Sequence, residues 1–478
     1  MSIFVKVKQR SYQDSLKLMR ISSDIQSIDG ITQAFAFMGT EINKSTRIPA
    51  GALTGEAAAA GPDDLIIMIE CDDATTASDV LSKFDEMIAS SSPVSSGSGL
   101  TTTRPPMTLD EAVTEAPEAN IAIISVPGQY AAAQAMRALQ LGLNVHLFSD
   151  NVTLEDELRL KEFAVKKGLL LMGPDCGTAI IQGTPLCFAN EVRKGEIGII
   201  AASGTGAQEV SCIIDALGGG ISHIIGVGGR DLSQDIGGIM TLHAIQLMAH
   251  DPSTKVIAIV SKPPAKAVAD KVLAAIKAAG KPTVLIFMGF KSDEPVYAKT
   301  LEEGAAKAVA LLKGEHTTGV AFPRKPVLSC PLFPGQTIIR GLYTGGTLAS
   351  EAEYILAENG ISSCEVIDLG GDEYTRGALH PMIDPTNRSA MAAKAAEDPA
   401  TAVILCDVVI GHGSHHNPAG ELAKAVEGSK TYVFASVTGT DADPQNKSQQ
   451  ERILRDAGII VFPSNQSAVE ACCALLKE

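Results

Sequence analysis

One stretch, residues 195–209 with the sequence GEIGIIAASGTGAQE, constrains the fold of this chain more than any other. The apolar run 197–202 is short and unbroken, which is typical of a strand buried on both faces of a sheet. The next four residues, 203–206, favour a tight turn, because glycine turns at little steric cost and lets the backbone approach a ligand closely. A helix is expected over 207–217. The stretch therefore predicts a strand, a turn and a helix N-terminus.

The start of this helix is a candidate anion site. The free N–H groups of a first helical turn point into the preceding loop, and the positive end of the helix dipole lies behind them. Such an end binds phosphate or carboxylate. The alternative is an ordinary strand-to-helix connection in which a Ser or Thr only caps the helix. Under the first interpretation, the phosphate-binding residues of this turn are Ser203, Gly204, Thr205 and Gly206.

Three further strands are expected downstream, over 221–227, 255–261 and 282–288, each followed by a turn rich in glycine or proline. Helices are expected between them, and this alternation predicts a parallel, doubly wound sheet. Ligands bind such sheets at the carboxyl edge, where these turns lie. An arginine there can hold an anion through two nitrogens. The cations in these turns are Arg230, Lys262 and Lys291.

The last third of the chain repeats this theme, as an internal duplication would. A strand over 339–343 runs into a Gly-Gly-Thr turn, and a strand over 402–409 runs into the turn 411–417. These turns supply a second set of expected phosphate-binding residues. Either the 345–348 turn or the 411–416 turn is expected to face the first set. That second set is Gly346, Thr347, Gly413 and Ser414.

Three histidines, His412, His415 and His416, raise the question of a metal site. Their spacing lacks the helical pair of a zinc motif, and no cysteine joins them. Contact with phosphate or substrate at a helix start is the preferred interpretation, and no metal is expected. Two other histidines, His223 and His243, are expected to have structural roles on a strand or helix face.

Two segments low in apolar periodicity, 90–106 and 315–335, are interpreted as linkers. A chain of 478 residues exceeds what one core holds, so several domains are expected. The expected domains are a small α+β module of ferredoxin-like style over 1–89, a partial Rossmann-like unit over 107–177, and doubly wound domains over 178–313 and 336–478.

Composition excludes some classes of function. The formal net charge of −16 argues against a nucleic-acid binder but not against a small anionic substrate. No apolar run is long enough to span a membrane, and the first residues lack the apolar core of a signal peptide. The nine cysteines are scattered, with no CxxC pair, which is typical of reduced thiols. We therefore expect a cytoplasmic protein without a membrane or nucleic-acid partner.

The chain resembles succinyl-CoA synthetase. Residues 120–290 are similar to its alpha subunit through ANIAIISVP, KGLLLMGPDCGTA and GEIGIIAASGTGAQE, and residues 337–478 are similar to the carboxyl-terminal domain of its beta subunit through VIDLGGDE and VILCDVVIGHGSHHNPAG. Over the whole chain it resembles the FdrA family of acyl-CoA synthetase-like proteins, through YQDSLKLMRIS, MGTEINK and the HPMIDPTNR motif at 380–388. The resemblance implies a CoA-binding-type domain over 107–177 and two flavodoxin-like domains.

Three departures from the synthetase bear on its mechanism. The synthetase has a phosphorylated histidine in a Gly-His-Ala-Gly loop after the strand equivalent to 282–288, whereas this chain has Met-Gly-Phe-Lys-Ser-Asp over 288–293. The Gly-rich first turn of the CoA-binding domain and the ATP-grasp domain are also absent. We therefore expect chemistry without a phosphoenzyme, with phosphate or an acyl phosphate as ligand, and leave CoA as an open candidate. A histidine of the 411–416 turn is the alternative phosphate carrier.

The resemblance leaves three functions open. The first is transfer of an acyl-type group through an acyl phosphate, most concretely carbamoyl transfer between carbamoyl phosphate and oxamate or oxalurate in allantoin (purine) catabolism, to which the FdrA family has been linked. The second is an acyl-CoA synthetase subunit that relies on partner chains for nucleotide and CoA. The third is a non-catalytic scaffold or metabolite sensor. Each implies an oligomer with partner subunits from neighbouring genes.

The catalytic candidates follow from these hypotheses. Arg230 and Lys262 are expected to stabilise charge on phosphate oxygens. His380 and Arg388 belong to the HPMIDPTNR motif, and we expect them to bind acceptor carboxylates or move a proton. The alternative for this motif, which also contains Asp384, is a capped turn with solvated charges. The FdrA resemblance favours the functional interpretation.

Overall fold

The computed structural model describes residues 2–11, 13, 18, 21–22, 25–26, 28, 30–40, 43–44, 55–71, 73–90, 106–290, 296–315, 332–375 and 379–477. The chain forms two compact units, the first ending at Arg104 and the second beginning at Pro105. Within the described ranges, none of the helices combines the length and the apolar character that crossing a membrane requires.

The first unit is built on a three-stranded antiparallel sheet with strand order β1-β3-β2. Its central strand is entirely buried except at Glu70, because its apolar side chains fill both faces. Phe84 on the following helix packs against the sheet. This confirms the α+β module. The elements are β1 (Ser2–Lys8), β2 (Ile31–Met38), α3 (Gly55–Ala59), β3 (Leu65–Cys71) and α4 (Ala74–Ser90).

The second unit starts with the partial Rossmann-like domain, a parallel sheet of three strands, β4-β5-β6. The Thr153 hydroxyl accepts a hydrogen bond from the Asp156 N–H and so begins α7, and Gly168, with a φ of 69°, ends it. The elements are α5 (Leu109–Glu115), β4 (Ile121–Ile124), α6 (Gly128–Gln140), β5 (Asn144–Leu147), α7 (Leu154–Lys167) and β6 (Leu171–Met172).

The central domain has strand order β13-β12-β11-β9-β10-β7-β8. Strands β9 to β13 are parallel in the order 2-1-3-4-5 of a flavodoxin-like fold. The four predicted strands are parallel, as expected, and a hairpin over 178–187 that was not predicted adds β7 antiparallel to β10 at one edge. Its elements are β7 (Thr178–Ile181), β8 (Thr184–Cys187), β9 (Lys194–Ala201), α8 (Gly204–Ala216), β10 (Ile221–Gly226), α9 (Ile239–His250), β11 (Val256–Ser261), α10 (Lys266–Ala279), β12 (Thr283–Phe287), β13 (Tyr297–Ala298) and α11 (Leu301–Lys313).

The C-terminal domain repeats this order in a parallel sheet, β15-β14-β16-β17-β18. Part of the HPMIDPTNR stretch is helical, although its composition is typical of a loop. Helix α14 begins at Thr386, and Arg388 lies in its first turn. The elements are β14 (Ile338–Tyr343), α12 (Gly346–Glu358), β15 (Cys364–Asp368), α13 (Asp372–Thr375), α14 (Thr386–Glu397), β16 (Thr401–Val409), α15 (Pro418–Ala425), β17 (Tyr432–Thr438), α16 (Lys447–Asp456), β18 (Ile460–Phe462) and α17 (Asn465–Lys477).

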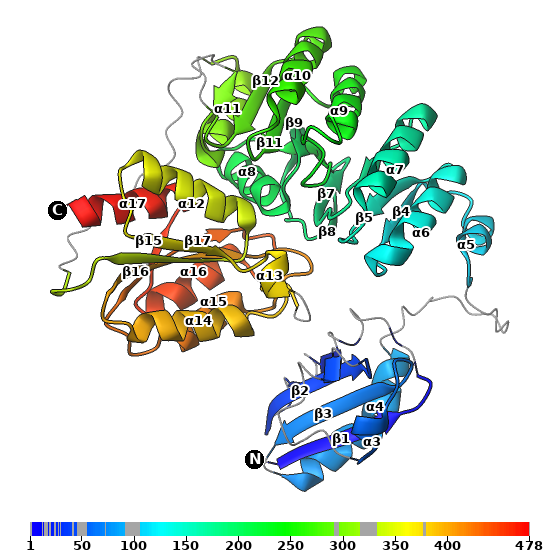
Figure 1. Cartoon of the computed structure of the whole chain (residues 1–478), viewed down its shortest axis with the longest axis vertical. Helices are drawn as coiled ribbons and strands as arrows, with labels where there is room; N and C mark the ends of the chain where they lie inside the picture. Colours follow the sequence, from blue (N-terminus) through cyan, green and yellow to red (C-terminus); the bar gives the residue numbers. More distant parts are fainter. Residues whose placement is uncertain are drawn as a thin grey trace. The chain divides into compact units, whose positions relative to one another are not determined.

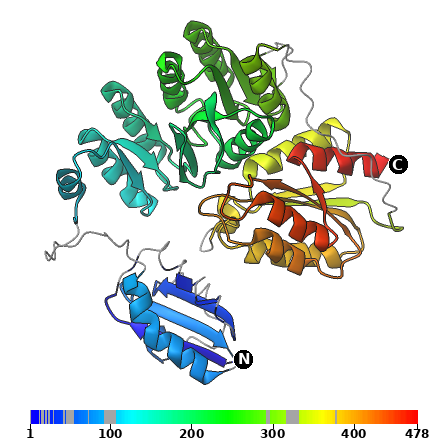
Figure 2. The ribbon, with the colours of Figure 1, turned by 180° about the vertical axis from the view of Figure 1, so that it is seen from behind.

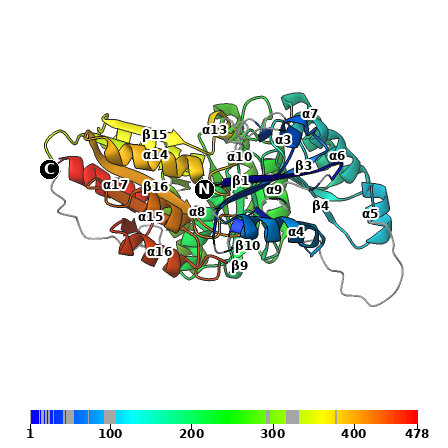
Figure 3. The same ribbon diagram turned by 90° about the horizontal axis from the view of Figure 1, so that it is seen from below.

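The two flavodoxin-like domains share one hydrophobic core. Helices α12 and α17 lie on the side of the C-terminal sheet that faces α8, and α14, α15 and α16 lie on the other side (Figures 1 and 2). Side chains such as Val210 on α8 and Ala352 on α12 belong to the same buried cluster. Helices α14 and α15 run side by side (Figure 3). The first strand–helix turns of both domains are thereby brought together.

Candidate functional site

Helix α8 begins three residues earlier than its sequence suggested. Ser203 is its N-cap, and the Ser203 Oγ accepts a hydrogen bond of 3.0 Å from the Gly206 N–H. The expected start at residue 207 was too late because two glycines obscured the first turn, whose conformation is fixed by the cap. Gly204, Thr205 and Gly206 are therefore the first turn of a helix at the switch point of the sheet, between β9 and β11.

The N-terminus of α12 meets the N-terminus of α8. The hydroxyls of Ser203 and Thr347 form a hydrogen bond across the two domains. A Cβ on Gly206 would lie 2.8 Å from the Thr347 methyl carbon, and one on Gly345 would lie 2.6 Å from the Thr205 hydroxyl oxygen. These two glycines are required because the helices approach closely. The structure thus brings the turn over 345–348 to the first predicted phosphate turn.

Gly204 differs from these glycines. A Cβ built on it would meet one neighbour within 4 Å, the Thr178 hydroxyl oxygen at 3.4 Å, which is an ordinary contact. The space beside Gly204 is therefore not filled by the partner helix. It is the position of the first turn where a ligand oxygen has the most room to approach the backbone.

Gly346 lies against a carboxylate. A Cβ on Gly346 would clash with Asp368 Oδ2, at the end of β15. Burial raises the pKa of Asp368, and the positive charge of Lys262 acts in the opposite direction, as do hydrogen bonds from Gly370 and Gly371. Lys262 of the central domain is therefore within electrostatic range of the α12 N-terminus.

Asp407, which sequence reasoning missed, anchors the turn before α12. Its fully buried carboxylate accepts hydrogen bonds from the Thr344 N–H (2.8 Å), the Thr344 hydroxyl (2.8 Å) and the Gly345 N–H (2.9 Å). Burial raises the pKa of Asp407, and the charge of Arg388 together with these hydrogen bonds opposes that shift. An aspartate inside the apolar run of β16 was the available signal, because a buried carboxylate needs partners.

Arg388 lies beneath this anchor with a side chain that is 1% exposed. Its Nη1 donates to the Asp407 carbonyl at 2.7 Å and lies 3.7 Å from Asp407 Oδ1. Its Nε and Nη2 are buried and have no hydrogen-bond partner among the described residues. The guanidinium of Arg388 therefore has two nitrogens whose N–H groups are unused.

His380 and His415 lie near the same turns. His380 Nδ1 accepts from the Met382 N–H, so Nε2 carries the proton, and the ring packs against Gly370. The backbone N–H of His415 donates to the Met382 carbonyl at 2.7 Å, and its ring Nδ1 accepts from the Asn417 N–H at 3.2 Å. Burial lowers the pKa of each imidazole to about 4, with His416 adding to the shift of His415. Both rings are neutral at pH 7.

The 411–416 turn packs elsewhere. A Cβ on Gly413 would lie 2.7 Å from the Phe188 ring, and His412 is hydrogen-bonded to Glu191 at 2.7 Å. The Ser414 hydroxyl is buried without a partner in the part of the chain that the structure describes. None of the described hydrogen bonds connects Gly413 or Ser414 to Ser203 or Thr347. Gly413 and His412 therefore contact the 188–191 segment of the central domain.

Arg230 is engaged by the Rossmann-like domain. Its Nη2 lies 2.8 Å from the Val152 carbonyl and 2.8 Å from Glu157 Oε2. The structure does not bring it to the Ser203 turn through any described contact. Lys291, the other cation of this edge, lies outside the described residues.

The turn equivalent to the phosphohistidine loop is aromatic. Phe290 stacks on Tyr297 with ring centroids 5.0 Å apart and meets Phe287 edge-on at 6.2 Å. The rest of the turn, from Lys291, is not described. In the described part, the loop thus packs a phenyl ring where the synthetase carries an imidazole.

A second buried feature that sequence reasoning missed is a set of carboxylates between the domains. Glu209 accepts from the Thr438 hydroxyl at 2.5 Å and from the Asn465 N–H at 3.2 Å. Glu351 accepts from the Leu301 N–H at 2.7 Å, and burial raises its pKa to about 8. The sequence signal for these carboxylates was a glutamate on a mostly apolar helix, Glu209 on α8 and Glu351 on α12.

Three family models match the chain. They are described as CoA-ligase over residues 342–475, CoA binding domain over 192–289, and AllF, heavy metal-associated domain, over 1–105. The first two cover the flavodoxin-like domains that meet at Ser203 and Thr347.

Individual proteins are similar to all or part of this chain. The chain is 42% identical to the protein YahF of Escherichia coli (strain K12), over 97% of each chain. It is 30% identical to the alpha 2 subunit of the ADP-forming succinate–CoA ligase of Archaeoglobus fulgidus, over 32% of this chain and 53% of that subunit. A solved structure, the dinucleotide-forming acetyl-coenzyme A synthetase 1 of Ca. Korarchaeum cryptofilum, is 17% identical and covers 74% of this chain and 82% of its own, with a TM-score of 0.33.

The residues of the first unit do not fit a heavy metal. Residues 1–105 contain one cysteine, Cys71, and no histidine. Cys71 is buried, and its thiol contacts the Asp73 carbonyl at 3.2 Å. The described residues hold no group of three His, Cys, Asp or Glu side chains that could bind a metal ion. Soft metals need thiolate or imidazole ligands, which this unit cannot supply.

Both the sequence motifs and these relatives point to one conclusion. The 42% identity to YahF extends over essentially the whole chain, and the three matched models occupy the two units in order. This chain belongs to the FdrA family of acyl-CoA synthetase-like proteins, in which a succinyl-CoA synthetase alpha-like part is joined to a CoA-ligase domain.

Proposed function

We propose that this chain is the subunit of a carbamoyltransferase that moves a carbamoyl group between carbamoyl phosphate and oxamate in allantoin (purine) catabolism. The observation that carries the proposal is the contact between Ser203 and Thr347, which sets two helix N-termini against each other at the switch points of two sheets. Two converging helix dipoles favour a phosphate group over a neutral ligand.

The reaction balances without a nucleotide. The oxamate nitrogen attacks the carbonyl carbon of carbamoyl phosphate, the carbon–oxygen bond to phosphate breaks, and a proton leaves the nitrogen as oxalurate forms. The helix N-termini and Lys262 would bind the phosphate and stabilise its charge. His380, neutral with its proton on Nε2, would donate a hydrogen bond to a substrate oxygen rather than accept a proton directly.

The aromatic turn at 289–290 supports a mechanism without a phosphoenzyme. Phe290 is packed against Tyr297 and cannot carry a phosphoryl group. An acyl phosphate that arrives ready-made needs only to be bound and oriented, which proximity and charge stabilisation provide.

The second candidate is an acyl-CoA synthetase subunit, which the matched CoA-ligase and CoA binding models favour. Partner chains would then supply the nucleotide and a phosphate carrier. A non-catalytic scaffold or sensor is the third candidate, because the same helix N-termini could hold a phosphorylated metabolite without turnover.

The deciding assay uses this chain together with the proteins encoded by neighbouring genes. Oxalurate formation from labelled carbamoyl phosphate and oxamate is expected, without any acid-labile, base-stable label on this chain from carbamoyl phosphate or ATP. Such a label, or acyl-CoA formation that requires ATP and CoA, would establish the synthetase mechanism instead. If phosphate or carbamoyl phosphate raises the melting temperature but the complete complex shows no turnover, the result would support a non-catalytic scaffold.

A variant of Gly204 tests the phosphate site directly. Gly204→Val should fold, because the space at its Cβ is open, but the added side chain should block a ligand from the backbone. We expect phosphate and carbamoyl phosphate to raise the melting temperature of the wild type and not that of the variant. Gly61→Val is the matched control, since its Cβ also has room, with Asp64 3.7 Å away. Equal phosphate affinity in a folded Gly204→Val protein would contradict the proposed site.

A further inference from the structure

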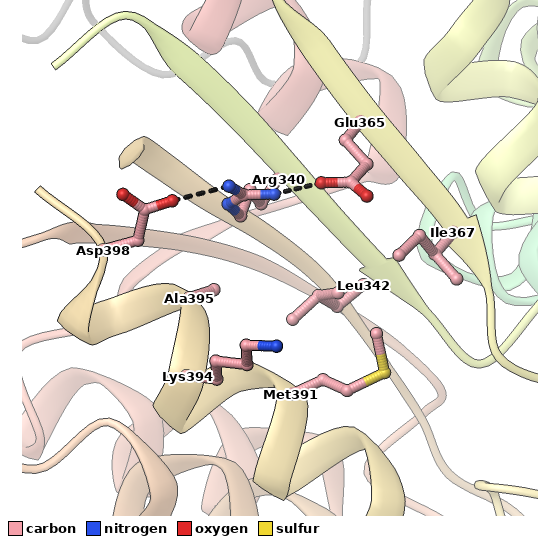
Figure 4. Close-up of a pocket in the computed structure, with 8 residues that line it drawn as sticks. All are labelled: Arg340, Leu342, Glu365, Ile367, Met391, Lys394, Ala395 and Asp398. Carbon is pink, nitrogen blue, oxygen red and sulfur yellow. Dashed lines mark hydrogen bonds and ion pairs between the residues drawn. The ribbon is translucent and has the colours of Figure 1, made fainter. Parts of the chain in front are cut away.

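A wedge-shaped pocket lies on the C-terminal domain, between the outer strands of its sheet and α14 (Figure 4). One wall consists of two cross-strand pairs on the same face of the sheet, Arg340 with Glu365 and Leu342 with Ile367. The other wall is one stripe of α14 together with its C-cap residue, Asp398. Its members are Met391, Lys394, Ala395 and Asp398, which are spaced as i, i+3, i+4 and i+7.

The pocket exists because α14 does not cover the outermost strand. The helix packs on β14 and β16, whereas β15 receives its main helical cover from α12 on the opposite face of the sheet. The side chains of Glu365 and Ile367 on β15 are therefore left partly exposed. The resulting space has a volume of about 380 Å³, which is within the size of small-molecule sites.

The charges of this pocket are unevenly paired. Arg340 is held between two carboxylates, Glu365 and Asp398, the latter at 2.6 Å, and its Nε donates to the Thr401 hydroxyl at 3.2 Å. Two carboxylates therefore share the single positive charge of Arg340. Lys394 forms no ion pair or hydrogen bond with any described residue, and its amine points into the space between the labelled side chains (Figure 4).

The other lining residues, Leu342, Ile367, Met391 and Ala395, are apolar. A ligand that fits must cover this surface and present one negative charge to Lys394. A dianion such as phosphate would meet Glu365 and Asp398 without an apolar body to bury.

We propose that this pocket binds a small monocarboxylate with a short apolar chain, at a site separate from the helix N-termini at Ser203 and Thr347. The carboxylate pairs with Lys394, and the chain packs on Leu342, Ile367 and Met391. The site requires no catalytic step and does not depend on the carbamoyl-transfer proposal. Met391 supplies the adaptable surface that such a chain needs.

The test is a titration of the full chain with hexanoate, followed through the methyl signals of labelled methionines. We expect a saturable shift of the Met391 signal, identified by its loss in Met391→Leu. Lys394→Gln should weaken hexanoate binding about fivefold, whereas Lys394→Arg should retain it. Lys424→Gln, the same charge change on α15, is the control and should leave hexanoate binding unaltered.

Two further measurements make the result decisive. Ile367→Trp, in a protein whose melting temperature shows that it folds, should fill the pocket and abolish the Met391 shift. Uncharged 1-hexanol should bind more weakly than hexanoate and respond equally in wild type and Lys394→Gln. An unshifted Met391 signal, or equal hexanoate affinity in wild type and Lys394→Gln, would overturn the proposal.

Discussion

Two fully buried aspartates anchor turns in the central and C-terminal domains, and their partners differ. Asp231 accepts from the Met240 N–H, the Thr241 N–H and the Thr241 hydroxyl, and pairs with Lys161 at 2.7 Å. Asp407 holds the turn before α12 in the same way, with Arg388 as its cation. Both aspartates and both cations are at most 1% exposed.

The cations are satisfied to different degrees. Lys161 uses all three of its donors, on Glu157 at 2.7 Å, Asp231 at 2.7 Å and the Val227 carbonyl at 2.9 Å. Arg388 leaves Nε and Nη2 without a partner in the described ranges. A buried donor without a partner costs free energy. The Lys161–Asp231 pair is therefore a fully satisfied structural ion pair, whereas the Arg388–Asp407 pair leaves unpaired N–H groups beside the candidate site.

The largest effect is expected from Lys161→Met. The substitution leaves Asp231 and Glu157 buried, with Arg230 as the remaining neighbour of Glu157. Removing one partner of a buried pair costs about 3–5 kcal/mol of unfolding free energy. Urea denaturation measures this loss. Arg230→Gln removes a side chain that is 47% exposed and leaves Glu157 paired with Lys161, so this control should cost less than Lys161→Met. If Lys161→Met lost less unfolding free energy than Arg230→Gln, the structural role of the Lys161–Asp231 pair would be contradicted.

A buried carboxylate that lacks a cation should respond to pH. The pKa of Glu351 is raised by burial from 4.5 to about 8, with Glu209 and Glu302 adding to the shift. Between these values the folded protein keeps a proton that the unfolded chain releases, so unfolding free energy falls as pH rises, by up to about 1.4 kcal/mol per pH unit, and levels off above pH 8.

The measurement for Glu351 compares wild type with Glu351→Gln in urea denaturation between pH 5 and pH 9. The variant cannot ionise at this position, so its stability relative to wild type should increase with pH. Parallel pH profiles of the two proteins would show that the proton is not retained. Glu358→Gln, at the exposed end of the same helix, is the matched control.

The two switch-point glycines should respond differently to the same substitution. Gly345→Ala places a Cβ 2.6 Å from the Thr205 hydroxyl oxygen and 2.8 Å from its Cβ, and overpacking of this kind costs about 1–3 kcal/mol. Gly204→Ala meets only an ordinary contact, and the expected change is within about 0.5 kcal/mol. Thermal unfolding of both variants tests this. Equal losses would mean that the helix N-termini do not approach as described.

A smaller effect than that of Lys161→Met is expected from Arg388→Met. Asp407 keeps its three hydrogen bonds to the turn, its carboxylate lies 3.7 Å from Arg388 Nη1, and two unpartnered nitrogens are removed, so the loss should be smaller than that of Lys161→Met. Urea denaturation beside Lys161→Met gives the direct comparison. A loss of unfolding free energy as large as that of Lys161→Met would show that the Arg388–Asp407 pair has the same structural role.

The sequence predicted much of the fold because its signals are local. The runs 197–202 and 402–409, apolar except at Asp407, overlap β9 and β16, since a strand covered on both faces is mostly apolar. The hairpin over 178–187 escaped because short strands at a sheet edge, with polar and apolar residues mixed, carry no distinct period.

The candidate site was predictable only in part. Glycine-rich turns after two buried strands indicated where helix N-termini would lie, and Ser203 and Thr347 were named from that pattern. The pattern could not show that these hydroxyls meet each other, because they are 144 residues apart. It also could not show that Arg230 is engaged by Glu157, or that Asp407 fixes the second turn.

The sequence by itself determined the two doubly wound domains and the absence of a histidine from the turn 289–292, since both depend on the order of residues along the chain. Tertiary structure alone decided which turns face each other, which cations are satisfied, and where α14 leaves β15 uncovered. The reason is physical: strand and helix formation follow local periodicity, whereas burial, pairing of charges and shape of a pocket arise only when distant elements pack.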